Sequence, residues 1–198
     1  MSTIAASPAL PRRGLDIGLA LKQAARLFVK DLAPLIIAAL IVAGLSVLTL
    51  GILAGPLFAG LYGMVIGRVR DGRQPAVGDV FAGFDRFWSY LAAALVLVLL
   101  IGLASITIVG GFLLATIWLY VFPLMVDRRL GLGAAMKASK DMVVRVGFWE
   151  HLALVVVLFV IVSVANGALA ILAAPFVVVA VSAAYFLADE KQATLENA

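Results

Sequence analysis

Three long stretches without a charged residue constrain this chain more than any other feature. They comprise 36 residues between Asp31 and Arg68, 40 between Arg86 and Asp127, and 38 between Glu150 and Asp189. As an α-helix, each stretch would be about 54 to 60 Å long at 1.5 Å per residue, against a hydrocarbon core of about 30 Å. Each stretch therefore predicts two membrane crossings rather than one.

Each charge-free stretch also contains residues that favour a break. These are Gly51 to Pro56, then Gly110 and Gly111, then Asn166 and Gly167, with Pro175 further on. The sequence thus predicts an all-α polytopic transmembrane bundle of six spans in three hairpins, near 34–52, 54–70, 88–108, 111–127, 150–168 and 171–188. The alternative is a single long tilted span with a re-entrant piece in one stretch, the first being the best candidate.

The composition leaves lipid as the solvent for most of the chain. Of 198 residues, 65% are hydrophobic and 13% charged, against about 45 to 50% apolar and 25% charged in soluble proteins, and the mean hydropathy is +1.16. A soluble domain of this size has too little interior for so much apolar surface. The chain has no cysteine, so it offers neither a disulfide nor a cysteine metal site.

The basic residues predict the orientation. The net charge is +4, but the cations flank the predicted spans and form no separate basic domain, so we expect no nucleic-acid partner. With three hairpins, all 15 Lys and Arg lie on one side, which the positive-inside rule assigns to the cytoplasm together with both termini. We expect residues 1–14 to be a disordered tail, 15–188 a single transmembrane domain and 189–198 a cytoplasmic tail.

An amphipathic segment precedes each hairpin, so that 15–70, 78–129 and 132–188 have the form of weak internal repeats. In the first segment Lys22, Arg26 and Lys30 are four residues apart, which places them in one stripe of a helix, with apolar residues such as Leu21 and Phe28 on another face. This pattern is typical of a helix that lies on the membrane. A basic start of the first span explains it equally well.

The candidate contact residues are the cations of the cytoplasmic side, because anionic headgroups attract Lys and Arg next to spans. Membrane lipids with anionic headgroups and a membrane protein partner are the expected contacts; the alternative is that these residues only set the topology. The candidates are Arg68, Arg70, Arg73, Arg128, Arg129, Lys137, Lys140 and Arg145.

The sequence gives little indication of catalysis. No Asp, Glu, Lys or Arg lies inside a predicted span, although ion-coupled carriers usually keep such groups at bilayer depth. His151 is the only histidine, and neither HExxH nor GxSxG occurs. We expect His151 at headgroup level, and an aromatic belt there that includes Trp88, Trp149, Tyr120 and Tyr185. No catalytic residue, cofactor or metal site is predicted.

Short motifs along nearly the whole chain carry a family resemblance. They are Gly55-Pro56-Leu57 with Gly60, Asp79-Val80-Phe81 with Gly83-Phe84, and Phe122-Pro123-Leu124 with Asp127-Arg128 leading to Ala134-Ala135 and Ser139. In these the chain resembles small bacterial membrane proteins of unknown function, a group similar to the membrane domain of some glycerophosphodiester phosphodiesterases. The resemblance implies a six-span protein of the bacterial inner membrane and carries over no catalytic residue.

We therefore expect a non-enzymatic membrane protein that contacts lipids or a partner through its basic cytoplasmic face. The alternative is a permease for an uncharged or lipid-like substrate, which predicts a polar-lined cavity at bilayer depth. Its candidate residues are Ser46, Thr49, Ser105, Thr107, Thr116 and Asn166. A third hypothesis, an intramembrane enzyme, would depend on His151 as its base.

Overall fold

The computed structural model describes residues 14–165 and 168–196, and in these ranges it contains helices and no strand. This confirms the predicted all-α class. The helices are α1 (Ile17–Lys30), α2 (Leu32–Leu48), α3 (Ala54–Asp71), the 3-10 helix η1 (Val77–Arg86), α4 (Phe87–Ala104), α5 (Ile108–Ile117), α6 (Val121–Asp127), α7 (Leu132–Val146), α8 (Phe148–Val164) and α9 (Ala168–Glu196). The predicted tail 1–14 and the predicted break at Asn166 and Gly167 lie, apart from Gly14, outside the described residues.

Helices occur at all six positions where spans are predicted, but they differ in length and polarity. Three described helical segments are long and apolar enough to cross a membrane: Val77–Ala104, Ile108–Asp127 and Leu172–Glu196. The number rises to five if α1 with α2, and α7 with α8, each form one bent span. α3 is not among them, because its last turn contains Arg68, Arg70 and Asp71.

The amphipathic segments form separate helices at large angles to the apolar helices that follow. The chain bends by 91° between α1 and α2 and by 108° between α7 and α8, where Gly147 has a positive φ of 147°. α1 is therefore not a straight continuation of α2, and both the helix that lies on the membrane and the basic start of a bent first span stay predictions. The order amphipathic helix, apolar helix, break, returning helix occurs three times along the chain.

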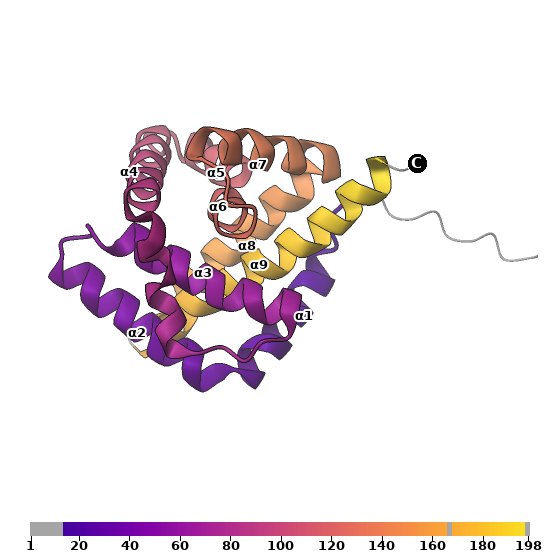
Figure 1. Cartoon of the computed structure of the whole chain (residues 1–198). Helices are drawn as coiled ribbons and strands as arrows, with labels where there is room; N and C mark the ends of the chain where they lie inside the picture. Colours follow the sequence, from indigo (N-terminus) through magenta and orange to yellow (C-terminus); the bar gives the residue numbers. More distant parts are fainter. Residues whose placement is uncertain (1–13, 166–167, 197–198) are drawn as a thin grey trace, which may run out of the picture.

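The apolar face of α1 packs against protein. Phe28 makes an edge-to-face contact with Phe176 of α9, with ring centroids 5.6 Å apart, and Lys191 Nζ donates a hydrogen bond to the Gly14 carbonyl at 2.6 Å. These contacts place α1 antiparallel along α9, at the edge of the molecule (Figure 1). The stripe that the sequence analysis assigned to lipid is thus largely covered by α9.

Two helices, α3 and α9, form the core. Figure 1 shows them in the middle of the molecule, with α4 and α7 above and α2 below. Ten residues of α3 are buried, and α9 contributes a buried run from Val178 to Tyr185. The apolar helices that follow the amphipathic segments, α2, α4 and α8, instead expose large apolar side chains. Among these are Ile37 and Leu40 of α2, Leu95, Val98 and Leu99 of α4, and Phe159 and Val160 of α8.

Glycines allow α3 and η1 to lie backbone against backbone. A Cβ atom at Gly60 would lie 1.8 Å from the Val80 carbonyl oxygen, and one at Gly83 would lie 2.0 Å from the Pro56 carbonyl oxygen. Only a residue without a side chain permits this approach. Gly60, Val80, Gly83 and Pro56 belong to the motifs that carry the family resemblance, so part of that resemblance lies at a single helix contact.

Candidate functional site

Six of the eight candidate cations form ion pairs with carboxylates of other segments. This gives them an internal role that the sequence analysis did not predict. The pairs are Arg68 with Asp31 (2.7 Å), Arg73 with Asp79 (3.0 Å), Arg129 with Asp85 (2.7 Å), Arg145 with Glu196 (3.3 Å), Arg70 with Asp127, and Arg128 with Asp189.

The pair between Arg68 and Asp31 is the only one of these six pairs in the described residues whose two side chains are both largely shielded from solvent. The two side chains are 13% and 11% exposed, and Arg68 Nη1 also donates to the Gly72 carbonyl at 2.9 Å. Asp31 begins α2 and Arg68 lies near the end of α3, so the pair joins the open ends of the first helical hairpin. A largely buried arginine needs such a partner, because an unpaired charge there is strongly unfavourable.

Asp127 joins three helices. It pairs with Arg70 from the end of α3 and accepts a hydrogen bond from Tyr185 Oη of α9 at 2.8 Å, while lying at the end of α6. Its side chain is 4% exposed. One carboxylate thus links the C-terminal parts of α3, α6 and α9.

The remaining pairs lie at the surface and bind more weakly. Their arginines are 44% to 68% exposed, and such pairs contribute about 0 to 1 kcal/mol each. The pKa of Arg128 is raised: burial acts against its charged form, but attraction to Tyr185 and Asp189 outweighs it. Arg128 therefore stays charged at any physiological pH.

The two candidate lysines, Lys137 and Lys140, lie exposed on α7 without a carboxylate within 4 Å in the described part of the chain. The same is true of Lys22, Arg26 and Lys30 on α1, which the candidate list omitted. Their spacing in the sequence was the signal that could have added them. Among these cations of the described residues, those without a carboxylate partner thus lie on α1 and α7 and not among the arginines at the ends of α3 and α6.

Below the ion pairs lies a buried group of rings that the sequence analysis placed at the membrane surface. Tyr120, Tyr185 and His151 are each 0% exposed, whereas Trp88 and Trp149 are 77% and 74% exposed. The three rings are thus covered by protein whereas the two tryptophans are exposed, and the headgroup level expected for these residues stays a prediction. Tyr120 lies between the other two rings, in contact with both His151 and Tyr185.

His151 and Tyr120 meet edge to face, with ring centroids 5.4 Å apart. His151 Nδ1 lies 2.5 Å from the Gly147 carbonyl oxygen, which places its proton on Nδ1. Neither His151 Nε2 nor Tyr120 Oη has a hydrogen-bond partner among the described residues. The described residues contain no group of three His, Cys, Asp or Glu side chains placed to hold a metal.

Ser139 of α7 hydrogen-bonds to the backbone at the break between α5 and α6. Its Oγ accepts a hydrogen bond from the Tyr120 N–H at 3.1 Å and donates one to the Ile117 carbonyl at 2.8 Å. Both backbone groups flank the break at 118–120, where the helix supplies no partner. One buried hydroxyl thus satisfies two backbone groups, as a non-aqueous interior requires.

Most of the hydroxyl groups proposed for a permease are engaged in local hydrogen bonds to the backbone of their own segment. Thr49, Ser105 and Thr116 each donate to a carbonyl four residues earlier in the chain, and Thr107 to one three residues earlier. Ser46 Oγ is buried without a partner in the part of the chain that the structure describes. The sixth candidate, Asn166, lies outside the described residues.

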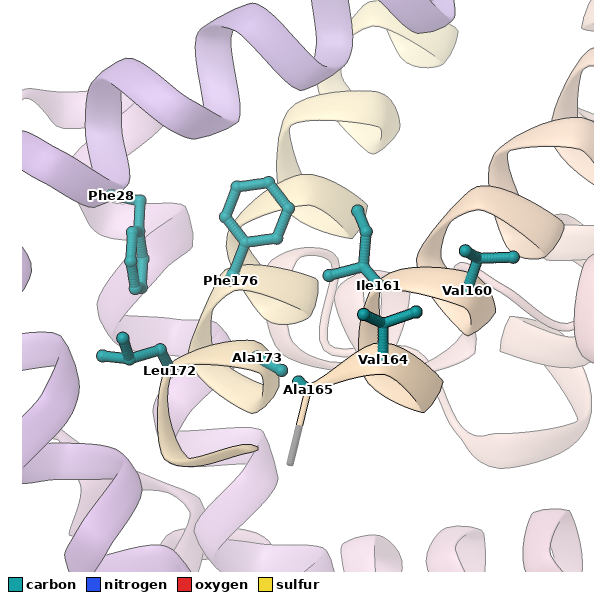
Figure 2. A pocket seen from close by; sticks show the side chains of 8 residues that line it. All are labelled: Phe28, Val160, Ile161, Val164, Ala165, Leu172, Ala173 and Phe176. Carbon is teal, nitrogen blue, oxygen red and sulfur yellow. The ribbon is translucent and has the colours of Figure 1, made fainter. Parts of the chain in front are cut away.

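A cavity of about 580 Å³ opens between α8 and α9, beside Phe28 of α1. Figure 2 shows carbon side chains around it. They are Phe28, Val160, Ile161, Val164, Ala165, Leu172, Ala173 and Phe176. These described side chains suit an acyl chain and offer no hydrogen bond to a polar solute.

No protein-family model, no curated protein and no solved structure matches this chain.

Proposed function

We propose that this chain is a non-enzymatic, six-span protein of the bacterial inner membrane, related to the membrane domain of glycerophosphodiester phosphodiesterases. Its three hairpins place both termini in the cytoplasm. There its basic end contacts anionic lipid headgroups or a membrane protein partner.

The ion pairs carry this proposal. In three hairpins, the starts of α2 and α4 and the ends of α3, α6 and α9 lie on the same side of the bilayer. The pairs Arg68 with Asp31, Arg70 with Asp127, and Arg129 with Asp85 join these ends to one another. A chain in which one stretch crossed only once would place some of these partners on opposite sides.

The proposal requires α3 to cross the membrane although its charge-free part is short. Two observations support it. α3 is surrounded by other helices and needs no wide lipid-facing surface. The charges of Arg68 and Arg70 are compensated by Asp31 and Asp127, and long arginine side chains reach the interface from within a span.

Topology reporters test the arrangement directly. Fusions after Gly72 and Gly131 are expected to report the cytoplasm, and fusions within the turns at 49–53 and 105–107 the periplasm. A periplasmic signal after Gly72 or Gly131 would refute the three hairpins. The fusion after Gly72 tests α3, and the fusion after Gly131 tests the second hairpin.

Gentle purification tests the binding role. We expect lipid or protein to copurify with the wild type and to be lost when the α7 face is reversed by Lys137→Glu, Lys140→Glu and Arg145→Glu. Copurification that is unchanged in this variant would contradict a role for the face. Substitution of the same three residues by Gln is the control, because it removes the positive charges without introducing negative ones.

A permease for lipid-like molecules is the second candidate, and the carbon-lined cavity between α8 and α9 supports it. Val164 lines this cavity and is 71% exposed, so Val164→Trp fills the space with little risk to the core. Vesicles that contain the wild type should move a fluorescent phospholipid between leaflets faster than vesicles with the variant. Equal rates would remove this candidate.

A further inference from the structure

The cations of α1 differ from most of the others in having no partner within the described protein. Lys22, Arg26 and Lys30 are exposed, and no carboxylate of the described residues lies within 4 Å of them. α1 contains no acidic residue. The two acidic residues that flank α1 in the sequence have other partners: Asp16 Oδ1 accepts the Leu19 N–H at 2.9 Å, and Asp31 pairs with Arg68.

The exposed face of α1 also carries apolar side chains. Val29 is 72% exposed and Leu19 42% exposed, and both lie among the three cations on the side away from α9. A face that mixes cations with exposed apolar residues is typical of helices at the level of lipid headgroups.

The 91° bend places these cations where a lipid-facing surface begins. α2 starts immediately after Lys30, and its Leu32, Ile37 and Leu40 are 38%, 48% and 47% exposed. An acyl chain that lies along this side of α2 brings its headgroup to Lys30 and, one turn earlier in α1, to Arg26. Both ends of a phospholipid are therefore matched at this corner of the protein.

We propose that the corner between α1 and α2 binds an anionic phospholipid, with Lys22, Arg26 and Lys30 at the headgroup and α2 along the acyl chain. The proposal rests on the proposed function, because it requires α2 to cross the bilayer from its cytoplasmic end. It assigns the lipid contact to the unpaired cations of α1 instead of to the arginines that form ion pairs.

The chain offers a matched pair of variants. Lys22→Gln/Lys30→Gln removes two exposed, unpaired lysines from α1, and Lys137→Gln/Lys140→Gln removes two from α7, where Asp141 lies beside Lys140 in the sequence. The readout is native mass spectrometry of the full chain in detergent, titrated with dioleoyl phosphatidylglycerol or with dioleoyl phosphatidylcholine. Arg26→Gln is a milder third variant in case the double variant on α1 does not fold.

We expect the α1 variant to bind phosphatidylglycerol about 25-fold more weakly, because each cation near an anionic surface contributes roughly fivefold in affinity. Arg26→Gln should lose about fivefold for the same reason. Binding of phosphatidylcholine should not change. The α7 variant also removes cations of the proposed contact face and should lose affinity too, but less than the α1 variant, because Asp141 beside Lys140 already lowers the net charge of α7. Equal losses in the two double variants, or none in the α1 variant, would overturn the proposal.

A reporter fusion after Gly72, which follows the first hairpin, separates the two proposals in the same variants. A cytoplasmic signal with unchanged phosphatidylglycerol binding overturns the α1 site alone, whereas a periplasmic signal overturns the topology on which it rests. A protein that copurifies with the wild type and is lost from the α1 variant, with lipid binding unchanged, would overturn the lipid assignment in favour of a protein partner.

Discussion

The helical segments Val77–Ala104 and Leu172–Glu196 are both apolar enough to cross a membrane, but they occupy different surroundings. In Val77–Ala104, which contains α4, 17% of the most apolar window is buried inside the protein, compared with 61% in Leu172–Glu196 of α9. α2 and α8 resemble α4 in exposing large aliphatic side chains, and α3 resembles α9 in burying its own. We call α2, α4 and α8 the leading helices and α3, α5–α6 and α9 the returning helices.

The difference teaches that hydrophobicity alone does not separate core from lipid contact in such a protein. Lipid tails are as apolar as leucine, so close packing selects small residues at helix contacts instead. The buried part of α9 contains Ala180, Ser182, Ala183 and Ala184, and α3 contributes Gly55, Ala59 and Gly60 to the core. The leading helix α4 has Leu95, Val98 and Leu99 at its exposed positions.

The largest expected effect compares two leucines. Leu57 of α3 is 0% exposed and Leu99 of α4 is 67% exposed. Leu57→Ala should lower the free energy of unfolding by about 2 to 5 kcal/mol, as for buried leucines in general, and Leu99→Ala by less than about 0.5 kcal/mol. Unfolding by a denaturing detergent gives both values. A large loss at Leu99 would mean that a leading helix packs against another protein chain and not against lipid.

The second prediction concerns the charged ends of the returning helices. Arg68→Gln leaves Asp31 largely buried without its partner and should lower the free energy of unfolding by about 3 kcal/mol. Arg145→Gln removes an exposed pair of the same type and should lower it by about 0 to 1 kcal/mol. A double-mutant cycle of Arg68→Gln with Asp31→Asn isolates the pair. Additive effects in this cycle would show that the ion pair does not join α2 to α3.

Much of the fold could be predicted from charge and turn residues, and the returning helices show where this stopped. Charge-free stretches with Gly and Pro near their middle are enough to place helices at the six expected positions. α3 was predicted as an ordinary span because only the number of uncharged residues was considered. That number does not reveal that α3, with 18 residues and three charges at one end, is an interior helix. Whether all six helices cross the membrane stays a prediction.

The site was harder to predict, because its contacts join distant parts of the chain. Arg68 lies 37 positions after Asp31, and Tyr185 lies 58 positions after Asp127. The arginines that flank the predicted spans were therefore interpreted as candidates for lipid contact, because their carboxylate partners are distant in the sequence. An apolar helix face likewise does not indicate whether lipid or protein covers it, so α1 was assigned to the membrane although its face packs on α9. His151 follows Glu150, and nothing in the sequence indicated that its ring is buried against Tyr120.

The third prediction compares a glycine of a returning helix with one of a leading helix. Gly60→Ala places a Cβ 1.8 Å from the Val80 carbonyl oxygen, whereas nothing lies within 4 Å of a Cβ at Gly44 of α2. Overpacking of this kind costs about 1 to 3 kcal/mol. Gly44→Ala should be neutral or stabilising by up to about 1 kcal/mol, since alanine favours helix. Melting temperatures in detergent that fall equally for both variants would contradict the close contact of α3 with η1.

The smallest expected effect concerns the break that distinguishes α5–α6 from the other two returning helices. Ser139→Ala removes both hydrogen bonds to the broken backbone and leaves the Tyr120 N–H and the Ile117 carbonyl unpaired in a buried position. The expected loss is about 1 to 3 kcal/mol, near the lower limit if water enters. Ser105→Ala is the control, because its hydroxyl is exposed and donates only to the Ile101 carbonyl of its own helix. Amide hydrogen exchange at residues 117–120 should increase in the Ser139 variant alone. Protection that stays at the wild-type level would show that the break is held by its neighbours in α6 and does not depend on α7.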